Sequence, residues 1–72
     1  MSKLAKILKM IKILQDGEIV STESLSTTLG VGGRMIRKYA DDIKEAGLPI
    51  KSKPGKNGGY YFEKNKEHEY YI

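Results

Sequence analysis

Residues 30 to 59 read GVGGRMIRKYADDIKEAGLPIKSKPGKNGG, and this stretch decides the fold. It begins with a glycine-rich turn and continues as a basic segment in which apolar residues recur at helical spacing. It ends in a lysine-bearing run of Pro, Gly and Asn, the residues that dominate turns. The order predicts a turn, then a basic helix, then a basic hairpin.

The basic helix is expected from about residue 33 to residue 46. Within it Ile36, Ala40 and Ile43 recur at spacings of four and three, which places them on one face of a helix. Gly47 supplies a C-terminal stop. These three apolar positions are therefore the expected core face of this helix.

A strand and its return strand are expected after the helix. Ile50 is predicted to point inward, with Tyr60 and Phe62 beside it on the return strand and Tyr61 on the opposite side. Residues 53–59 form the loop between the two strands. This hairpin completes the predicted architecture at its C-terminal end.

An amphipathic first helix is expected over residues 3–15, because its apolar side chains recur at helical spacing. Met10 and Ile13 are expected at the edges of the apolar face, against a flanking strand or the C-terminal tail rather than in a dimer contact. The expected core face consists of Leu4, Ile7, Leu8, Ile11 and Leu14.

A short second helix is expected before the glycine-rich turn. Ser21 or Thr22 is predicted to cap its N-terminus, Leu25 and Leu29 form its apolar stripe, and Gly30 ends it. The fold class is therefore α+β, with three helices followed by a C-terminal β-hairpin.

Length and charge bound the organisation of the chain. Seventy-two residues make one small domain, and without cysteine apolar packing alone must hold it. Residues 31–56 contain seven basic and three acidic residues and so carry the whole net charge of +4, whereas residues 63–72 contribute −1. We expect a domain over residues 1–62 and a charged, tyrosine-ended tail over residues 63–72.

Several classes of function are excluded on residue chemistry. No apolar run is long enough to cross a bilayer, so a cytoplasmic protein without a membrane partner is expected. His68 has no Cys or second His to share a metal, and the adjacent Asp41 and Asp42 point about 100° apart on a helix. The glycine-rich loop lacks a following Gly-Lys-Ser/Thr. We predict no enzyme activity, metal, cofactor or small-molecule ligand.

The basic helix separates its charges along its axis. Arg34, Arg37 and Lys38 lie in the first half and acidic residues in the second, an order that opposes the helix macrodipole. Contact with phosphates and base edges explains this polarity. The alternative is two surface pairs, Arg37 with Asp41 and Lys38 with Asp42, each worth about 0.2 to 0.5 kcal/mol.

DNA binding follows from this helix and the hairpin behind it, because a helix fits the major groove and a basic loop reaches phosphates or the minor groove. Arg34 and Arg37 are expected to read bases, since arginine binds guanine in a bidentate fork, and Lys38 to meet phosphate. Met35 either contacts a thymine methyl group or packs at the core edge. The candidate DNA-binding residues are Thr22, Gly33, Arg34, Met35, Arg37, Lys38, Lys51, Lys53, Lys56 and Asn57.

A resemblance to known domains rests on six segments: Ile7-Leu8 through Leu14-Gln15, Val20-Ser21-Thr22-Glu23, Leu29-Gly30-Val31, Ile36-Arg37-Lys38, Glu45-Ala46-Gly47-Leu48-Pro49-Ile50 and Gly58-Gly59-Tyr60-Tyr61-Phe62. Together they resemble the winged helix-turn-helix domains of DeoR-type and biotin-repressor-like bacterial regulators. The resemblance implies binding of double-stranded DNA by the third helix and the hairpin, called the wing, within a bacterial transcription regulator.

Other readings remain beside this one. The chain is either a fragment of a longer regulator or a small plasmid or phage accessory factor for excision or conjugative transfer. A winged helix also serves as a protein-protein interaction module, in which case the basic face meets an acidic partner. A monomer of this size covers a short site, so a homodimer or several copies on repeated sites are expected.

Overall fold

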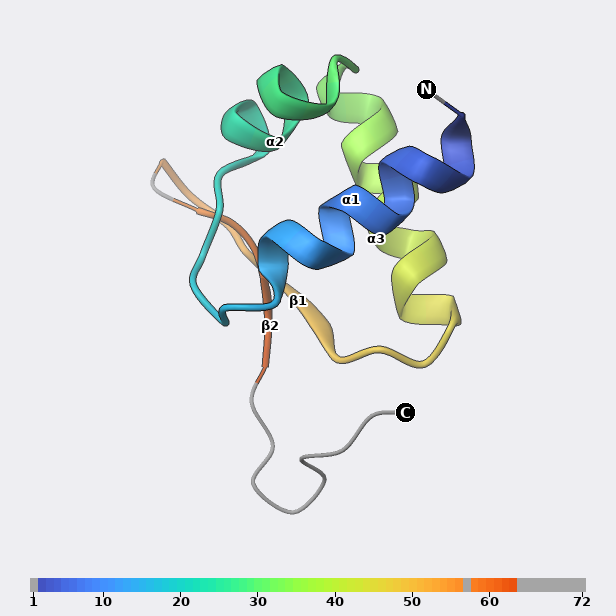
Figure 1. Cartoon of the computed structure of the whole chain (residues 1–72). Helices are drawn as coiled ribbons and strands as arrows, with labels where there is room; N and C mark the ends of the chain where they lie inside the picture. The colour runs from blue at the N-terminus through green and yellow to red at the C-terminus, as the bar shows by residue number, and fades with distance from the viewer. Residues whose placement is uncertain (1, 57, 64–72) are drawn as a thin grey trace.

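The computed structural model describes residues 2–56 and 58–63 as three helices followed by a two-stranded antiparallel sheet (Figure 1). The elements are α1 (Lys3–Leu14), α2 (Thr22–Leu29), α3 (Gly33–Glu45), β1 (Ile50–Lys53) and β2 (Gly59–Phe62). This confirms the predicted α+β fold, a winged helix-turn-helix. Of the predicted tail, residues 63–72, only Glu63 lies within the described residues.

Local hydrogen bonds fix both ends of α2. The Ser21 hydroxyl accepts from the backbone N–H of Ser24 at 3.0 Å, so Ser21 rather than Thr22 is the cap. At the other end Gly30 has φ of +71°, a left-handed conformation that glycine adopts without steric cost. The Ser26 carbonyl then accepts from the N–H groups of Gly30 and Val31. These contacts build the turn between α2 and α3.

The core lies where the three helices meet the base of the hairpin. The predicted core positions of α2, α3 and β1 are all buried, which confirms those assignments. Tyr39, also on α3, is only 2% exposed and belongs to the same core. The buried hydrophobic residues are Met10, Leu14, Leu25, Leu29, Ile36, Tyr39, Ala40, Ile43 and Ile50.

The predicted core face of α1 is wrong at three positions. Met10 is fully buried, whereas Leu4 and Leu8 are 65% and 56% exposed. At about 100° per residue, Leu8 lies roughly 160° around the helix from Met10, so the two side chains cannot face the same core. α1 packs along the line of Met10 and Leu14, which lie one turn apart. The apolar residues of α1 cover a wider arc of the helix than the elements packed against it can bury, so Leu4 and Leu8 stay exposed.

The wing is anchored to the segment before α2. Val20 and Tyr60 form an antiparallel bridge, with the Val20 N–H donating to the Tyr60 carbonyl at 2.9 Å and the Tyr60 N–H returning a bond at 3.0 Å. A Cβ on Gly59 would lie 2.1 Å from the Val20 carbonyl oxygen, so only glycine permits this approach. The bridge sets the wing beside the N-terminus of α2. In the described part of the chain, no helix is long and apolar enough to cross a membrane.

Candidate nucleic-acid interface

The face of α3 that points away from the core is basic. Arg34, Arg37 and Lys38 are all exposed, while Ile36 on the same helix is fully buried. Successive side chains differ by about 100°, which places Arg34 and Lys38 farthest from the core and Arg37 on one flank. Met35 is 37% exposed on the other flank. The structure therefore presents the predicted reading positions to solvent.

The alternative role of the basic residues of α3 was to form two ion pairs on the helix surface. Among the described residues, Arg37 does not pair with Asp41, and Lys38 does not pair with Asp42. The Asp42 carboxylate instead lies 3.6 Å from the ammonium group of Lys3, because the core packs α1 against α3. Asp42, in the acidic half of α3, thus pairs with a residue of α1 and not with Lys38.

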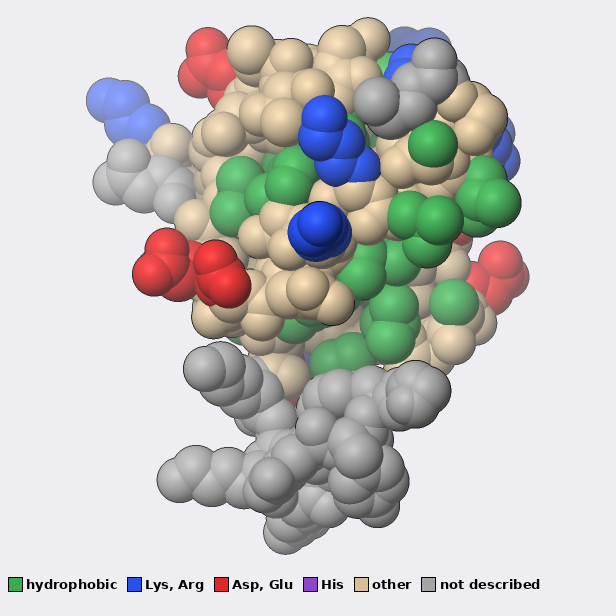
Figure 2. All heavy atoms as spheres, viewed as in Figure 1, with side chains coloured by type: hydrophobic (Ala, Val, Ile, Leu, Met, Phe, Trp, Pro, Cys, Tyr) green, Lys and Arg blue, Asp and Glu red, His purple; other side chains and the backbone are tan. Residues whose placement is uncertain are grey.

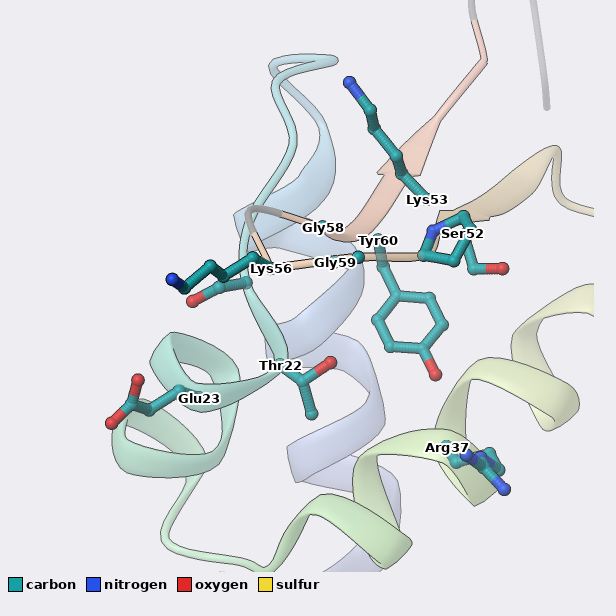
Figure 3. Close-up of a pocket in the computed structure, with 12 residues that line it drawn as sticks. Thr22, Glu23, Arg37, Ser52, Lys53, Lys56, Gly58, Gly59 and Tyr60 are labelled. Carbon is teal, nitrogen blue, oxygen red and sulfur yellow. The ribbon is translucent and has the colours of Figure 1, made fainter.

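A pocket of about 480 Å³ opens between the start of α2, the middle of α3 and the wing (Figure 3). The elements meet there because the Val20–Tyr60 bridge holds the wing against the segment that leads into α2. Its lining residues are Ser21, Thr22, Glu23, Arg37, Ser52, Lys53, Pro54, Gly55, Lys56, Gly58, Gly59 and Tyr60.

The close-up shows how the charged groups are arranged around this pocket. The Tyr60 ring points from β2 toward α3, where Arg37 lies (Figure 3). Lys56 and Glu23 lie on the same side of the pocket, whereas the Lys53 side chain points away from the Tyr60 ring (Figure 3). Three cations and one carboxylate thus border a hollow that also presents hydroxyl groups. This chemistry suits phosphate oxygens.

The structure brings several predicted site residues together here. Thr22, Arg37, Lys53 and Lys56 all line the pocket. Gly33 begins α3 beside them, since a Cβ on it would lie 3.6 Å from the Thr22 methyl carbon. The first turns of α2 and α3 therefore form one continuous surface with the wing.

Other predicted residues lie outside the pocket. Arg34, Met35 and Lys38 occupy the exposed face of α3 next to it. Lys51 is at the base of β1, where its ammonium group lies 3.9 Å from the Glu63 carboxylate. Asn57 falls outside the described residues.

Sequence reasoning did not include eight of the residues that line the pocket, namely Ser21, Glu23, Ser52, Pro54, Gly55, Gly58, Gly59 and Tyr60. Glu23 sits in the first turn of α2, where an acid stabilises a helix, so its sequence context carries no sign of an interface. Tyr60 was expected only in the core. It does pack against the core, and being half-buried it also presents its ring to the pocket.

A metal centre finds no support at this surface. The residues that the structure describes contain no group of three His, Cys, Asp or Glu side chains placed to hold a metal ion.

The surface formed by α3 and the wing offers positive charge and hydrogen-bond donors on a convex helix with a flanking hairpin. A polyanion with a groove is its natural complement.

Comparison with known families agrees with this geometry. The chain matches the family model of the HTH domain, the helix-turn-helix, over residues 3–61. The match runs from the start of α1 to within one residue of the end of β2. The HTH domain is a DNA-binding domain rather than an enzyme fold. The matched region includes all three helices, the turn between α2 and α3, and nearly all of the wing. The chain therefore belongs to the HTH domain family.

Proposed function

We propose that this protein is a sequence-specific binder of double-stranded DNA, the DNA-binding unit of a bacterial transcription regulator of the DeoR or biotin-repressor type. α3 enters the major groove, and the wing contacts the backbone or the adjacent minor groove. The observation that carries the proposal is that Arg37, from the exposed basic half of α3, lines the same pocket as Lys53 and Lys56 of the wing. One duplex then meets both.

Base reading falls to the outer face of α3. Arg34 and Arg37 have the planar fork that matches guanine O6 and N7, and neither is held by an acidic residue of its own helix. Lys38 meets phosphate as a point charge. Met35, more than a third exposed, is placed to touch a thymine methyl group.

The residues at the rim of the pocket are proposed to contact the phosphates of the DNA backbone. Thr22 offers its hydroxyl beside the first turn of α3, and Lys53 and Lys56 bring charge from the wing. Asn57, next to Lys56 in the sequence, adds an amide in this proposal. Lys51 is proposed to contact a phosphate at the edge of the interface. It would leave its exposed ion pair with Glu63 to do so, and such a surface pair contributes little to stability.

Gly33 contributes by having no side chain. It occupies the first position of α3, and an added Cβ would make only an ordinary contact with Thr22, so the fold itself does not require glycine there. Gly33→Ala is expected to raise stability by about 0.5 to 1 kcal/mol, the usual helix preference for alanine. The same change should weaken DNA binding, because the methyl group stands where the duplex approaches.

Thermal unfolding followed by circular dichroism, and titration of labelled duplex on the same sample, measure both effects of Gly33→Ala. Gly32→Ala serves as the comparison, since a Cβ at Gly32 meets nothing within 4 Å of the protein. A variant at position 33 with unchanged affinity for duplex would remove Gly33 from the interface.

The wing lysines should act on all sequences alike. Lys56→Ala is expected to weaken binding to preferred and unrelated duplexes by the same factor and to lower the slope of log affinity against log salt by about 1. Lys9→Ala, which removes an exposed lysine on α1, is the matched control and should leave both unchanged. A loss of base preference in the Lys56 variant would assign sequence reading to the wing.

The affinity of the intact chain for unrelated duplex DNA tests the proposed function. About six phosphate contacts imply a slope near −5 in log affinity against log salt concentration. No binding to duplex at low salt, or a flat salt response, would overturn DNA binding and leave the protein-interaction module.

Selection of bound fragments from random duplex then identifies the site. A single domain covers few base pairs, so we propose that two copies, as a homodimer or on repeated half-sites, act together. Enriched fragments should contain paired motifs about one helical turn, or a multiple of it, apart. The accessory role in excision or conjugative transfer gives the alternative outcome, a longer array of motifs.

A further inference from the structure

The side of α1 that faces away from the core carries an apolar stripe that DNA binding does not use. Leu4 and Leu8 are one turn apart and are 65% and 56% exposed, and the half-buried Ile11 continues the stripe toward the core. Figure 2 shows hydrophobic side chains gathered on the face of the molecule that carries α1, with basic side chains beside them. Two neighbouring leucines exposed to this degree form a small apolar surface on which another segment can pack.

Basic residues border the stripe. Lys9 and Lys12 are exposed, and α1 contains four lysines and no acidic residue. The Lys3 ammonium group is already paired with Asp42. The complement of this face is therefore a short segment that combines apolar side chains with negative charge.

A second copy of the chain fits this face poorly. Two leucines offer on the order of 200 Å² of apolar surface, whereas a stable complex buries about 800 Å² on each partner. Pairing of two α1 helices would also set lysines against lysines, which is unfavourable. A segment of the same chain needs far less area, because a tether replaces the cost of association with a millimolar effective concentration.

The sequence after β2 has the required chemistry. Lys64 and Lys66 come first, and Glu67 and Glu69 then precede Tyr70, Tyr71 and Ile72. The charged groups that adjoin the apolar residues are therefore the anionic ones. These residues lie outside the described part of the chain, which ends at Glu63.

The position of Glu63 gives that segment the reach it needs. The Glu63 N–H donates to the Pro49 carbonyl at 2.9 Å, and the strand before it packs against α1. The six residues between Glu63 and Tyr70 let the chain extend up to about 23 Å, whereas the 12 residues of α1 span about 18 Å. The connection from Glu63 to Tyr70 can thus be longer than α1, the helix that carries the stripe.

We propose that residues 70–72 of the same chain dock on the α1 stripe formed by Leu4, Leu8 and Ile11, with Glu67 and Glu69 beside Lys9 and Lys12. The tyrosine rings and the isoleucine cover the leucines, and the carboxylates meet the bordering ammonium groups. The proposed docking surface lies on α1, a different element from the α3 and wing surfaces assigned to DNA. The proposal does not depend on DNA binding.

Chymotrypsin cleavage after Tyr70 and Tyr71 in the intact chain, followed by mass spectrometry, tests the contact, because a docked segment is cut only when it opens. The wild-type chain should be cut more slowly at these bonds than a free peptide of residues 64–72. The double variant Leu4→Ser with Leu8→Ser should be cut several-fold faster than the wild type, because its segment has lost its apolar contact.

The matched control is Ile19→Ser, which replaces a comparably exposed hydrophobic residue outside α1 and should leave the cleavage rate unchanged. Thermal unfolding verifies that each variant is folded. Wild-type cleavage as fast as the free peptide, or no acceleration in the leucine variant, would overturn the proposal. Acceleration by Ile19→Ser would overturn it as well, since protection would then be global. Protection that disappears on dilution would assign the stripe to a second copy and also refute docking within one chain.

Discussion

Replacing Arg34 or Arg37 by alanine is expected to weaken binding to the preferred duplex by about 1 to 3 kcal/mol, which is roughly 5- to 150-fold. Each arginine is proposed to form two hydrogen bonds to one guanine, and alanine forms none. Affinity for unrelated duplex should fall much less. The two changes are therefore expected to reduce the preference for the selected site and not only the affinity.

Fluorescence titrations of each variant against the selected site and against a scrambled duplex, at one salt concentration, measure the preference. Arg34→Lys and Arg37→Lys retain the charge without the bidentate fork and should lose preference while keeping most non-specific affinity. Lys9→Ala on α1 controls for the loss of one exposed positive charge. If affinity fell equally for the selected and the scrambled duplex, the arginines would contact phosphates and would not read bases.

Met10→Ala is expected to cost about 2 to 5 kcal/mol of unfolding free energy, the range for a large-to-small change in a packed core. Met10 is fully buried among the core residues, so its removal leaves a cavity that the surrounding helices fill only in part. In a domain of this size each kcal/mol lowers the unfolding temperature by about 4 to 8 °C. The loss should be plain in a thermal scan.

Leu4→Ala is the matched control for Met10→Ala, because it also truncates a large apolar side chain of α1 but at a site that the three-helix core does not enclose, where Leu4 is 65% exposed. Its cost should stay below about 1 kcal/mol, and alanine's helix propensity offsets part of it. Equal destabilisation by the two changes would contradict the packing of α1 described above.

The sequence predicted best those elements whose burial follows from local pattern. Ile36, Ala40 and Ile43 form a narrow stripe on an otherwise polar helix, so only one face of α3 can enter the core. Ile50 could be placed inward in the same way, since the rest of β1 is polar.

α1 was harder to predict because its apolar residues cover more than one face. Because the apolar arc is broad, α1 could bury nearly equal apolar area in several rotations about its own axis. Contacts with α2, α3 and β2 select one of them. Those contacts bury Met10 and leave Leu8 exposed. The same packing turns Asp42 toward Lys3 and away from Lys38.

By itself, the sequence determined the number, order and type of the described elements, the turns between them, and the basic character of α3 and the wing. These features depend on residues close together in the chain: a left-handed glycine at position 30, helical spacing in α3, and alternation in the hairpin. The tertiary structure alone decided which face of α1 is buried and that Thr22, Arg37 and Lys56 border one pocket. The physical reason is that both outcomes depend on contacts between distant segments, above all the Val20–Tyr60 bridge that Gly59 permits.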